Sequence, residues 1–577
     1  LGYADFTASL GGGAGQVDLS GGGGFSAYGG NRAVNIGGDK HTLKWADPFF
    51  VGDNKALMLG GPQSNATIDF QNGIDLAGKT RTVYSYNGSG NIIDAKISGS
   101  ISNSTGVGSL VKQGAGVLEL SNNNTYTGQT KIANGSILQT HAGALGTGNL
   151  LISGEQNNYD AQLGLGSGNF IKSLGVGAGQ VQMTGTGAGF FAYGANRSVN
   201  IGNDRQTLVW GSTYFNPGKL VLSHATSDAT TDFQNGIDLG GASRTIQVDN
   251  GSKTVDVILS GVISNGTLVK TGAGTLDLVA NTSNLTGVSV KGGEFLLSAS
   301  IGSANKDVSG GVFGLMNGDL ITTIGTGSDQ LQFTAGGGFA AYGGDRKVAF
   351  VDSNSLPVTL KWGNTGFIPF NEVRDGQGNV TATDTNSLAN SLILGSDYST
   401  GAIELQNNID LSQKQRSFEI RNGTAATDVT LSGNITNGVD GIVKTGGGTL
   451  QLTGTNSYTG TTGIQSGRLI VSNTGSLASS VSLQKNTAFI YNGTSSYLGN
   501  VTMDGAEFYY NSAALFKGSV SGSTSGWTGI LGGNANFSEM YLFVGKNQTL
   551  SPGFEGTGTL IANSVSFQYV GTYLWKI

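Results

Sequence analysis

The sequence predicts an all-β protein built as one long β-solenoid, in which short strands stack coil upon coil. Glycine supplies 99 of the 577 residues, about 17% against a usual share of roughly 7%. Glycine, asparagine and serine interrupt alternating apolar and polar segments about every eight to twelve residues. No stretch shows the 3.6-residue period of an amphipathic helix. Proline numbers only 6, which excludes a proline- and glycine-rich linker.

The low charge and the lack of cysteine limit the kinds of protein that this chain can be. Charged residues make up 12% of the chain, the formal net charge is −6 and the pI is about 5.2. A disordered chain usually has high net charge, so the composition favours a folded protein. The absence of basic clusters argues against nucleic acid and anionic membranes as partners. Without cysteine, stability must come from many repeated contacts, and an unfolded chain can be exported without premature disulfides.

A block of about 160 residues occurs three times, followed by a divergent part. The recurring segments are residues 6–17, 170–181 and 320–331; residues 25–32, 190–197 and 339–346; and residues 110–120, 268–278 and 442–452. We therefore divide the chain into repeats 1–160, 161–310 and 311–475 and a C-terminal β region, 476–577. One repeat is longer than a single solenoid coil, so each repeat must contain several coils.

Alternation with frequent turns fits either several β-sandwiches or one β-solenoid. The repeats follow one another without proline-rich or charged linkers, which favours a single solenoid. We expect about 20–25 residues per coil and ~4.8 Å between stacked strands.

Apolar residues at recurring positions are the predicted core. Inward stacking is expected of Phe25, Phe190, Phe339, Leu118, Leu276 and Leu450. The tyrosines that follow, Tyr28, Tyr193 and Tyr342, should lie at the adjoining corner, and we expect Trp45, Trp210 and Trp362 in the core. The alternative for these aromatic residues is a platform on which glycans stack.

The third recurring block resembles the autotransporter-associated β-strand repeat of bacterial surface proteins. The resemblance extends from Leu110 through Tyr126 and Gly128 to Leu138, and again from Ile442 to Leu469. The middle copy departs from it, because residues 283–287 replace the Asn-Thr-Tyr-Thr-Gly core. Near the end, residues 550–560 resemble the segment that often closes such passengers. The resemblance implies a right-handed parallel β-helix displayed outside the cell.

Candidate chemistry is sparse, and we predict no catalytic, cofactor-binding or metal-binding residues. A glycan-cleaving site needs clustered carboxylates, and the candidates are Asp69 with Asp75, Asp232 with Asp238, and Glu404 with Asp410. All three pairs occupy one repeat position, which favours a structural role over three identical active sites. The same holds for Arg32, Arg197 and Arg346 and for Lys112, Lys270 and Lys444, which we expect to pair with carboxylates or cap turns. His41, His141 and His224 share no repeat position and cannot supply a zinc site.

Three functions remain: a structural fibre or surface assembly, an adhesin for glycans or other cells, and a polysaccharide-acting enzyme. The repeated, site-poor sequence weighs against an enzyme. Residues 6–10 match internal coils and thus provide no terminal cap, so we expect self-association, head to tail, through Phe6–Leu10 and a C-terminal strand with Tyr569, Tyr573 and Trp575.

No apolar run is long enough to span a membrane. Residues 1–5 lack the features of a signal peptide, so we expect a mature extracellular or surface form.

Overall fold

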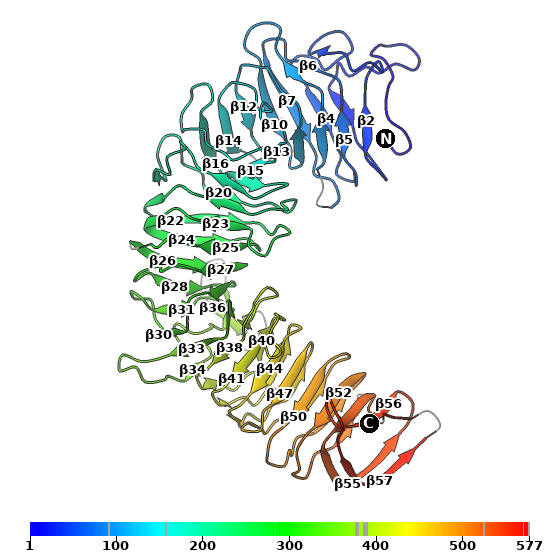
Figure 1. The fold of residues 1–577 in the computed structure, drawn as a ribbon, viewed down its shortest axis with the longest axis vertical. Helices are drawn as coiled ribbons and strands as arrows, with labels where there is room; N and C mark the ends of the chain where they lie inside the picture. The colour runs from blue at the N-terminus through cyan, green and yellow to red at the C-terminus, as the bar shows by residue number, and fades with distance from the viewer. Residues whose placement is uncertain are drawn as a thin grey trace. The chain divides into compact units, whose positions relative to one another are not determined.

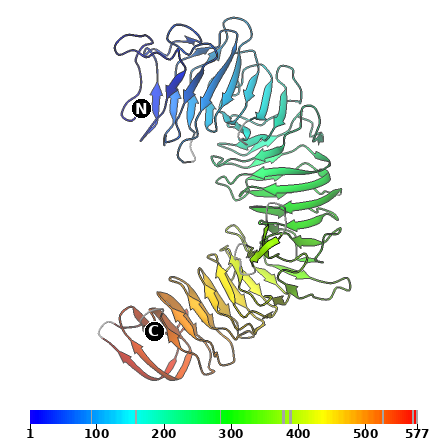
Figure 2. The same cartoon turned by 180° about the vertical axis from the view of Figure 1, so that it is seen from behind.

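The computed structural model describes residues 1–90, 93–155, 159–282, 284–374, 380–384, 390–522, 526–568 and 571–574. These residues form two compact units, each described by itself. Unit 1 comprises residues 1–288 and 299–302, and unit 2 comprises residues 289–298 and 303–577. The described residues contain strands, turns and bridges but no helix, and the strands of each unit lie in stacks (Figure 1 and, from behind, Figure 2).

Unit 1 consists of parallel sheets whose strands come from successive coils. The first sheet has the order β1 (Gly23–Phe25), β4 (Ala56–Leu59), β7 (Thr80–Ser85), β10 (Ser109–Gln113), β12 (Thr130–Ile132), β14 (Leu150–Gly154), β16 (Val181–Gly185). The second runs β2 (Arg32–Val34), β5 (Ile68–Phe70), β8 (Ala95–Ile97), β11 (Val117–Leu120), β13 (Gly135–Gln139), β15 (Ala161–Leu165), β17 (Ala188–Ala192), β20 (Lys219–Leu222), β22 (Ile237–Val248), β24 (Ile263–Thr271). Shorter ladders complete the coils: β3 (Leu43–Lys44), β6 (Ile74–Asp75), β9 (Ile101–Ser102), and β18 (Arg197–Val199), β21 (Thr231–Phe233), β23 (Val257–Leu259), β25 (Thr275–Leu278), with β19 (Leu208–Val209) beside β22.

Unit 2 repeats this arrangement. One sheet runs β27 (Glu294–Leu297), β29 (Val312–Leu315), β32 (Gly337–Ala341), β37 (Leu392–Leu394), β40 (Arg416–Ile420), β43 (Ile442–Thr445), β46 (Thr462–Ile464), β49 (Val481–Leu483), β51 (Val501–Met503), β53 (Val520–Ser521). A second runs β30 (Leu320–Thr322), β33 (Arg346–Phe350), β38 (Ile403–Leu405), β41 (Val429–Leu431), β44 (Thr449–Leu452), β47 (Arg468–Val471), β50 (Ala488–Tyr491), β52 (Ala506–Tyr510), β54 (Gly529–Gly533), β56 (Gln548–Pro552), β58 (Thr572–Tyr573). Smaller parallel ladders are β28 (Asn305–Val308) with β31 (Leu331–Phe333), β34 (Leu360–Lys361) with β39 (Ile409–Asp410) and β42 (Ile435–Thr436), β45 (Thr455–Asn456) with β48 (Ser476–Leu477), and β55 (Ala535–Val544) with β57 (Leu560–Phe567). The one antiparallel strand pair in the described part of this unit joins β35 (Asn371–Arg374) to β36 (Val380–Asp384).

The predicted parallel β-solenoid is confirmed. Leu110 is in register with Thr130 and Thr130 with Leu150, so two successive coils of unit 1 each take 20 residues. In unit 2 the step from Thr462 to Val481 takes 19 residues. The two 20-residue coils lie at the short end of the expected 20–25 residues and the 19-residue coil lies just below it, whereas the step from Arg32 to Ile68 takes 36 residues. The handedness of the coil stays a prediction.

At one repeat position, glycine adopts a left-handed backbone conformation that turns the chain. Gly135 has φ +64 and Gly467 has φ +67, in the left-handed region that disfavours residues with a Cβ. A Cβ at Gly467 would also lie 2.4 Å from the carbonyl oxygen of Gly448 in the preceding coil. Chain direction and coil stacking both require glycine here.

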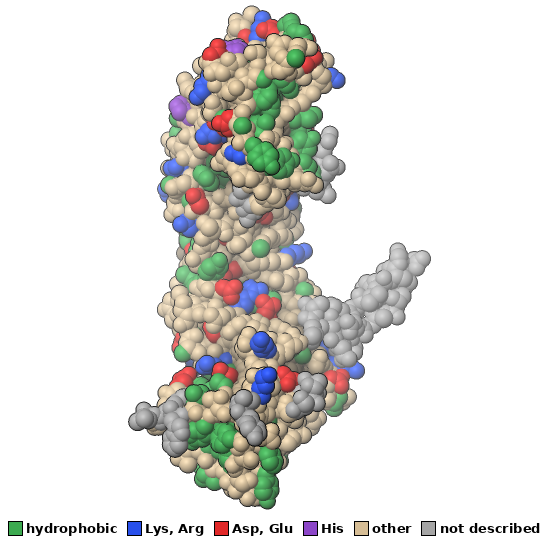
Figure 3. All heavy atoms as spheres, turned by 90° about the vertical axis from the view of Figure 1, so that its right-hand side faces the viewer, with side chains coloured by type: hydrophobic (Ala, Val, Ile, Leu, Met, Phe, Trp, Pro, Cys, Tyr) green, Lys and Arg blue, Asp and Glu red, His purple; other side chains and the backbone are tan. Residues whose placement is uncertain are grey.

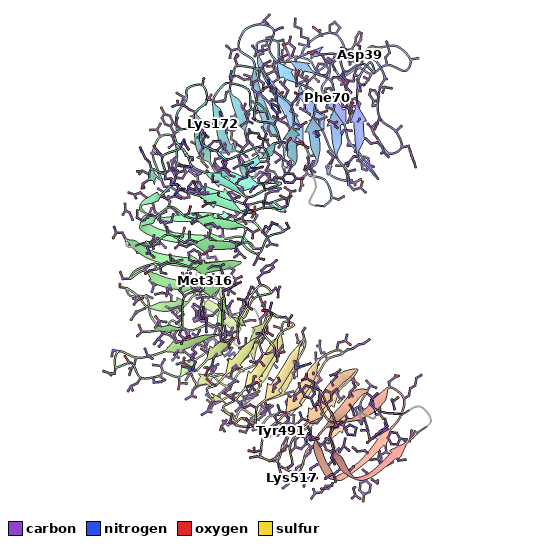
Figure 4. The ribbon with its side chains drawn as sticks, in the orientation of Figure 1. Asp39, Phe70, Lys172, Met316, Tyr491 and Lys517 are labelled. Atoms are coloured by element: carbon purple, nitrogen blue, oxygen red, sulfur yellow. The ribbon has the colours of Figure 1, made fainter. Side chains whose placement is uncertain are left out.

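The core of each unit is a ladder of apolar side chains in register. In unit 1, Ile137, Leu163 and Phe190 are in register on three successive coils, and all three side chains are fully buried. In unit 2 the equivalent inward series is Leu450, Leu469, Phe489 and Phe508, in which the two phenylalanine rings stack at 5.3 Å. Tyr491, labelled in Figure 4, stacks on Tyr510 at 5.4 Å. Buried apolar area contributes about 25 cal/mol per Å², so like-on-like stacking provides the main stabilisation.

Five of the six predicted core residues are buried: Phe190, Phe339, Leu118, Leu276 and Leu450. The prediction for Phe25 is wrong, because its side chain is only half-buried. It lies on β1, whose only partner among the described strands is β4, and its ring contacts Phe6 at 4.8 Å. A strand with a neighbouring coil on one side only cannot enclose its side chains.

Candidate functional site

The second carboxylate of each recurrent pair, Asp75, Asp238 or Asp410, caps a turn. Asp75 accepts hydrogen bonds from Ser104 Oγ at 2.5 Å and from the backbone N–H of Ala77 at 2.9 Å. Burial opposes ionisation of Asp75, but the hydrogen bonds from Ser104 and Ala77 outweigh it and lower its pKa. Asp238 and Asp410 likewise accept a backbone N–H two residues ahead and an asparagine side chain of the next coil.

The other carboxylate of each pair lies on a different strand. Asp69 is on β5 whereas Asp75 is on β6, and these strands belong to different sheets. Asp232 accepts from Ser260 Oγ at 2.5 Å, and Glu404 accepts from Ser432 Oγ at 2.8 Å. Each carboxylate is thus bonded within its own turn or to the next coil.

The recurrent arginines bind backbone carbonyls of the turns. Arg197 donates to the carbonyl oxygens of Leu165 and Gly166, at 3.1 and 2.8 Å. Arg346 donates to those of Met316 and Tyr342, both at 2.7 Å, and Arg32 to that of Gly2 at 2.7 Å. All three arginines thus donate to backbone carbonyl groups of the solenoid itself.

The tryptophans are core residues, and each is paired with an arginine that the sequence analysis missed. Trp45, Trp210 and Trp362 are almost fully buried. The guanidinium groups of Arg81, Arg244 and Arg416 lie over them, 5.6 to 5.8 Å from the ring centroids. Each arginine also donates to the leucine carbonyl five residues earlier. The signal was visible as an Asp-Leu pair followed, after four residues, by arginine.

The recurrent lysines are the most unusual residues of the repeats, because Lys112, Lys270 and Lys444 are completely buried. Lys112 Nζ donates to the carbonyl oxygen of Gly114 in its own turn, at 2.6 Å, and to that of Asn134 in the next coil, at 2.9 Å. Lys444 Nζ reaches Gly446 and Ser466 in the same way, at 2.9 and 2.7 Å. Lys112 and Lys444 therefore each tie two successive coils together, whereas Lys270 Nζ donates to the carbonyl oxygens of Gly272 and Gly274, both in its own turn.

A buried aspartate accompanies every one of these lysines. Asp94, Asp256 and Asp428 each accept two backbone N–H groups, one from a nearby loop and one from the strand of the following coil, at 2.6 to 2.8 Å. Burial lowers the pKa of Lys112 to about 7, and the charge of Asp94 acts against this shift. Burial also raises the pKa of Asp94.

The aspartates were missed although they recur. Each begins an Asp-x-x-(Ile/Leu)-Ser-Gly segment, at residues 94–99, 256–261 and 428–433. Their distance in sequence from the lysines varies from 14 to 18 residues, so only the coil register shows that the two belong together.

The histidines do not converge. His41 contacts Asp39 on the surface. His141 Nδ1 accepts the N–H of Gly143 at 3.1 Å. His224 stacks on Phe191 at 5.0 Å, and burial lowers its pKa to about 4. In the described part of the chain, no three His, Cys, Asp or Glu residues lie close enough together to hold a metal ion.

The surface combines scattered charge with local apolar patches. On the face shown in Figure 3, hydrophobic side chains gather on the upper part, which unit 1 forms. Tyr28 is exposed and Tyr193 half-buried, whereas Tyr342 is buried, so only part of the predicted tyrosine corner faces solvent.

Stacked parallel coils with ladders of inward apolar side chains define this chain as a parallel β-solenoid. The passenger-associated-transport-repeat model matches residues 110–139, 263–297 and 442–471. The chain thus carries three such repeats, of the kind found in autotransporter passenger domains, and each contains one of the buried lysines. The middle match extends through the segment where the sequence departs from the other two copies. Comparisons with curated proteins and with solved structures gave no match.

Passenger repeats imply secretion to the cell surface or beyond it. No helix in the described residues is long and apolar enough to cross a membrane.

Proposed function

We propose that this chain is a structural protein of a bacterial cell surface that acts by associating with further copies of itself, and that it is not an enzyme. Two features support this proposal. The recurrent charged residues, which would be the obvious catalytic candidates, are bonded to the turns and coils of the solenoid itself. An exposed strand edge with apolar side chains supplies a surface for association.

The observation that carries the proposal is the edge of β57. This strand pairs only with β55 among the described strands, and its sequence contains no charged residue and no proline. Ile561, Val565 and Phe567 on β57 are 40 to 52% exposed. Proteins usually protect strand edges with lysine, proline or a covering loop, so a strand with these exposed apolar side chains and no charged residue favours pairing with another chain.

In unit 1, the segment that begins at Phe6 pairs in the same way as an internal segment. Phe6 forms a parallel bridge with Val34, as Phe170 does with Val199. On the C-terminal strand, Tyr573 is 37% exposed, whereas Tyr569 and Trp575 lie outside the described residues.

Charged residues on the edge test the proposal. We expect the intact chain to form oligomers or filaments in sedimentation velocity and negative-stain microscopy. Ile561→Lys with Val565→Lys should give monomers, because charge on an edge strand opposes pairing. The matched control is Ile171→Lys with Val176→Lys, which changes two exposed apolar residues of unit 1 and should leave assembly unchanged. Deletion of residues 1–10, or Ala8→Pro, should abolish assembly from the other end.

A monodisperse monomer at high concentration would contradict self-association. The alternative function, an adhesin for glycans or other cells, would then take first place. It is favoured by exposed aromatic side chains on unit 1.

A further inference from the structure

We infer that unit 1 carries a binding platform for a neutral glycan, formed by Tyr84, Tyr86, Met58 and Gln113. Tyr84 lies near the end of β7 and points outward, because Val83 and Ser85 on either side of it are buried. The rings of Tyr84 and Tyr86 contact each other with centroids 4.6 Å apart and planes at 51°.

Neighbouring strands extend this aromatic pair. Tyr84 is in register with Met58 on β4 and with Gln113 on β10. Met58 is 37% exposed, so its thioether side chain extends the accessible surface beside the Tyr84 ring.

The Tyr84 ring is held in place from below. A Cβ at Gly114 would lie 2.6 Å from Tyr84 Cε1, so the ring packs directly over this glycine of the turn after β10. The platform is therefore fixed by the scaffold before any ligand arrives, which lowers the ordering cost of binding.

The three repeats provide an internal comparison. The positions of Tyr84 and Tyr86 correspond to Gln247 and Asp249 in the second repeat and to Glu419 and Arg421 in the third. The backbone bonding is the same, since the N–H groups of Tyr86, Asp249 and Arg421 donate to Leu59, Leu222 and Leu394 of the preceding coil.

At these positions the other two repeats satisfy their polar groups internally. Gln247 Nε2 donates to Asp249 at 2.9 Å, and Arg421 Nε donates to Glu419 at 2.7 Å. In the described residues, the hydroxyls of Tyr84 and Tyr86 and the amide of Gln113 have no such partner. The solenoid therefore accepts three different pairs here, and the aromatic pair is not required for folding.

The chemistry of the platform selects its ligand. Aromatic rings bind the apolar face of a flat ligand, while hydroxyl and amide groups bond its polar edge. The members of the platform are uncharged, and the charged pair on the adjoining strands, Lys131 with Glu155, is already joined at 2.6 Å. A pyranose ring presents both an apolar face and hydroxyl groups. A protein partner needs about 20–30 residues on each side, far more than this patch offers.

Replacing the Tyr84–Tyr86 pair by the residues of another repeat tests the inference without disturbing the fold. Tyr84→Gln with Tyr86→Asp installs the pair of the second repeat, and Tyr86→Ala is a milder variant. The matched control, Glu419→Gln with Arg421→Asp, installs the same pair in the third repeat. Binding is measured by isothermal calorimetry and ligand-observed NMR with cellohexaose, laminarihexaose, maltohexaose and chitohexaose.

We expect the intact chain to bind at least one of these oligosaccharides. The double exchange should weaken binding at least about ten-fold, Tyr86→Ala should weaken it in the same direction, and the control should bind like the intact chain. Absence of binding to all four at millimolar concentration, or equal binding by the exchanged variant, would overturn the inference. Assembly in sedimentation should be the same for all variants, which separates this site from the proposed self-association.

Discussion

Replacing the buried Lys112 by methionine removes the ammonium group but keeps an unbranched side chain in the core. Lys112 Nζ satisfies the carbonyl groups of Gly114 and Asn134, and each buried carbonyl left without a donor costs about 1–3 kcal/mol. The variant should therefore be less stable than the natural chain at high pH, where burial of the lysine costs least.

The pH dependence of this loss follows from the pKa of Lys112. Burial lowers it to about 7, whereas an unfolded lysine has a pKa of about 10.4. Folding thus releases a proton between these values, so the contribution of Lys112 is complete above the unfolded pKa and declines as the pH falls toward 7. At about 1.36 kcal/mol per pKa unit, the free energy of unfolding should rise by about 2 kcal/mol from pH 7 to pH 9. Methionine lacks this gain, so Lys112→Met should be more destabilising at pH 9 than at pH 7 by that amount.

Hydrogen exchange measured by mass spectrometry is the appropriate assay, because stacked coils open locally rather than all at once. Peptides that cover β10, β11 and β13 report on the affected coils, after correction for intrinsic exchange rates at each pH. Lys131→Met is the matched control, since Lys131 lies on the adjacent strand and forms a surface ion pair with Glu155. If Lys112→Met and the natural chain change in parallel between pH 7 and pH 9, Lys112 has no lowered pKa and the argument fails.

The remaining predictions concern fold and chemistry. Far-UV circular dichroism should show one β minimum, and more than roughly 15% helix would contradict the solenoid. Leu450→Ala should cost about 2–5 kcal/mol in local exchange protection, while Gln451→Ala, its half-buried neighbour, should cost far less. Gly467→Ala should destabilise its coil by at least about 1–2 kcal/mol, whereas Gly463→Ala, where an added Cβ meets no atom closer than 3.8 Å, should be tolerated. Incubation with pectin-, alginate- or glucan-type substrates should give no cleavage; cleavage lost on Asp75→Asn would refute the non-enzymatic proposal.

Sequence alone could predict the ladders because alternation fixes which side chains point inward. Leu118, Leu276 and Leu450 lie at the centre of strands flanked on both sides, so their burial follows from period-2 alternation alone. Phe25 has the same local pattern but lies beside a single coil, and exposure there depends on a neighbour that the local sequence does not specify.

The buried lysine–aspartate units could not be predicted in the same way. A lysine or aspartate in an alternating strand normally faces water, and here both point into the coil. Their burial is stable only because backbone N–H and C=O groups from other coils supply their hydrogen bonds. Since those partners lie 19 to 23 residues away, the coil length must be known before the unit can be recognised.

Three copies of one scaffold separate what folding needs from what function uses. Where the copies agree, as at Lys112, Lys270 and Lys444, hydrogen bonds to the turn that follows the lysine account for the residue. Where they differ on an identical backbone, as at Tyr84, Gln247 and Glu419, packing cannot account for the difference, because the same turn accepts all three. Exposed positions that differ between copies are thus where ligand or partner contacts should be sought. The Tyr84–Tyr86 pair is such a position: it is half-buried, it differs from the pairs of the other repeats, and its hydroxyls have no partner among the described residues.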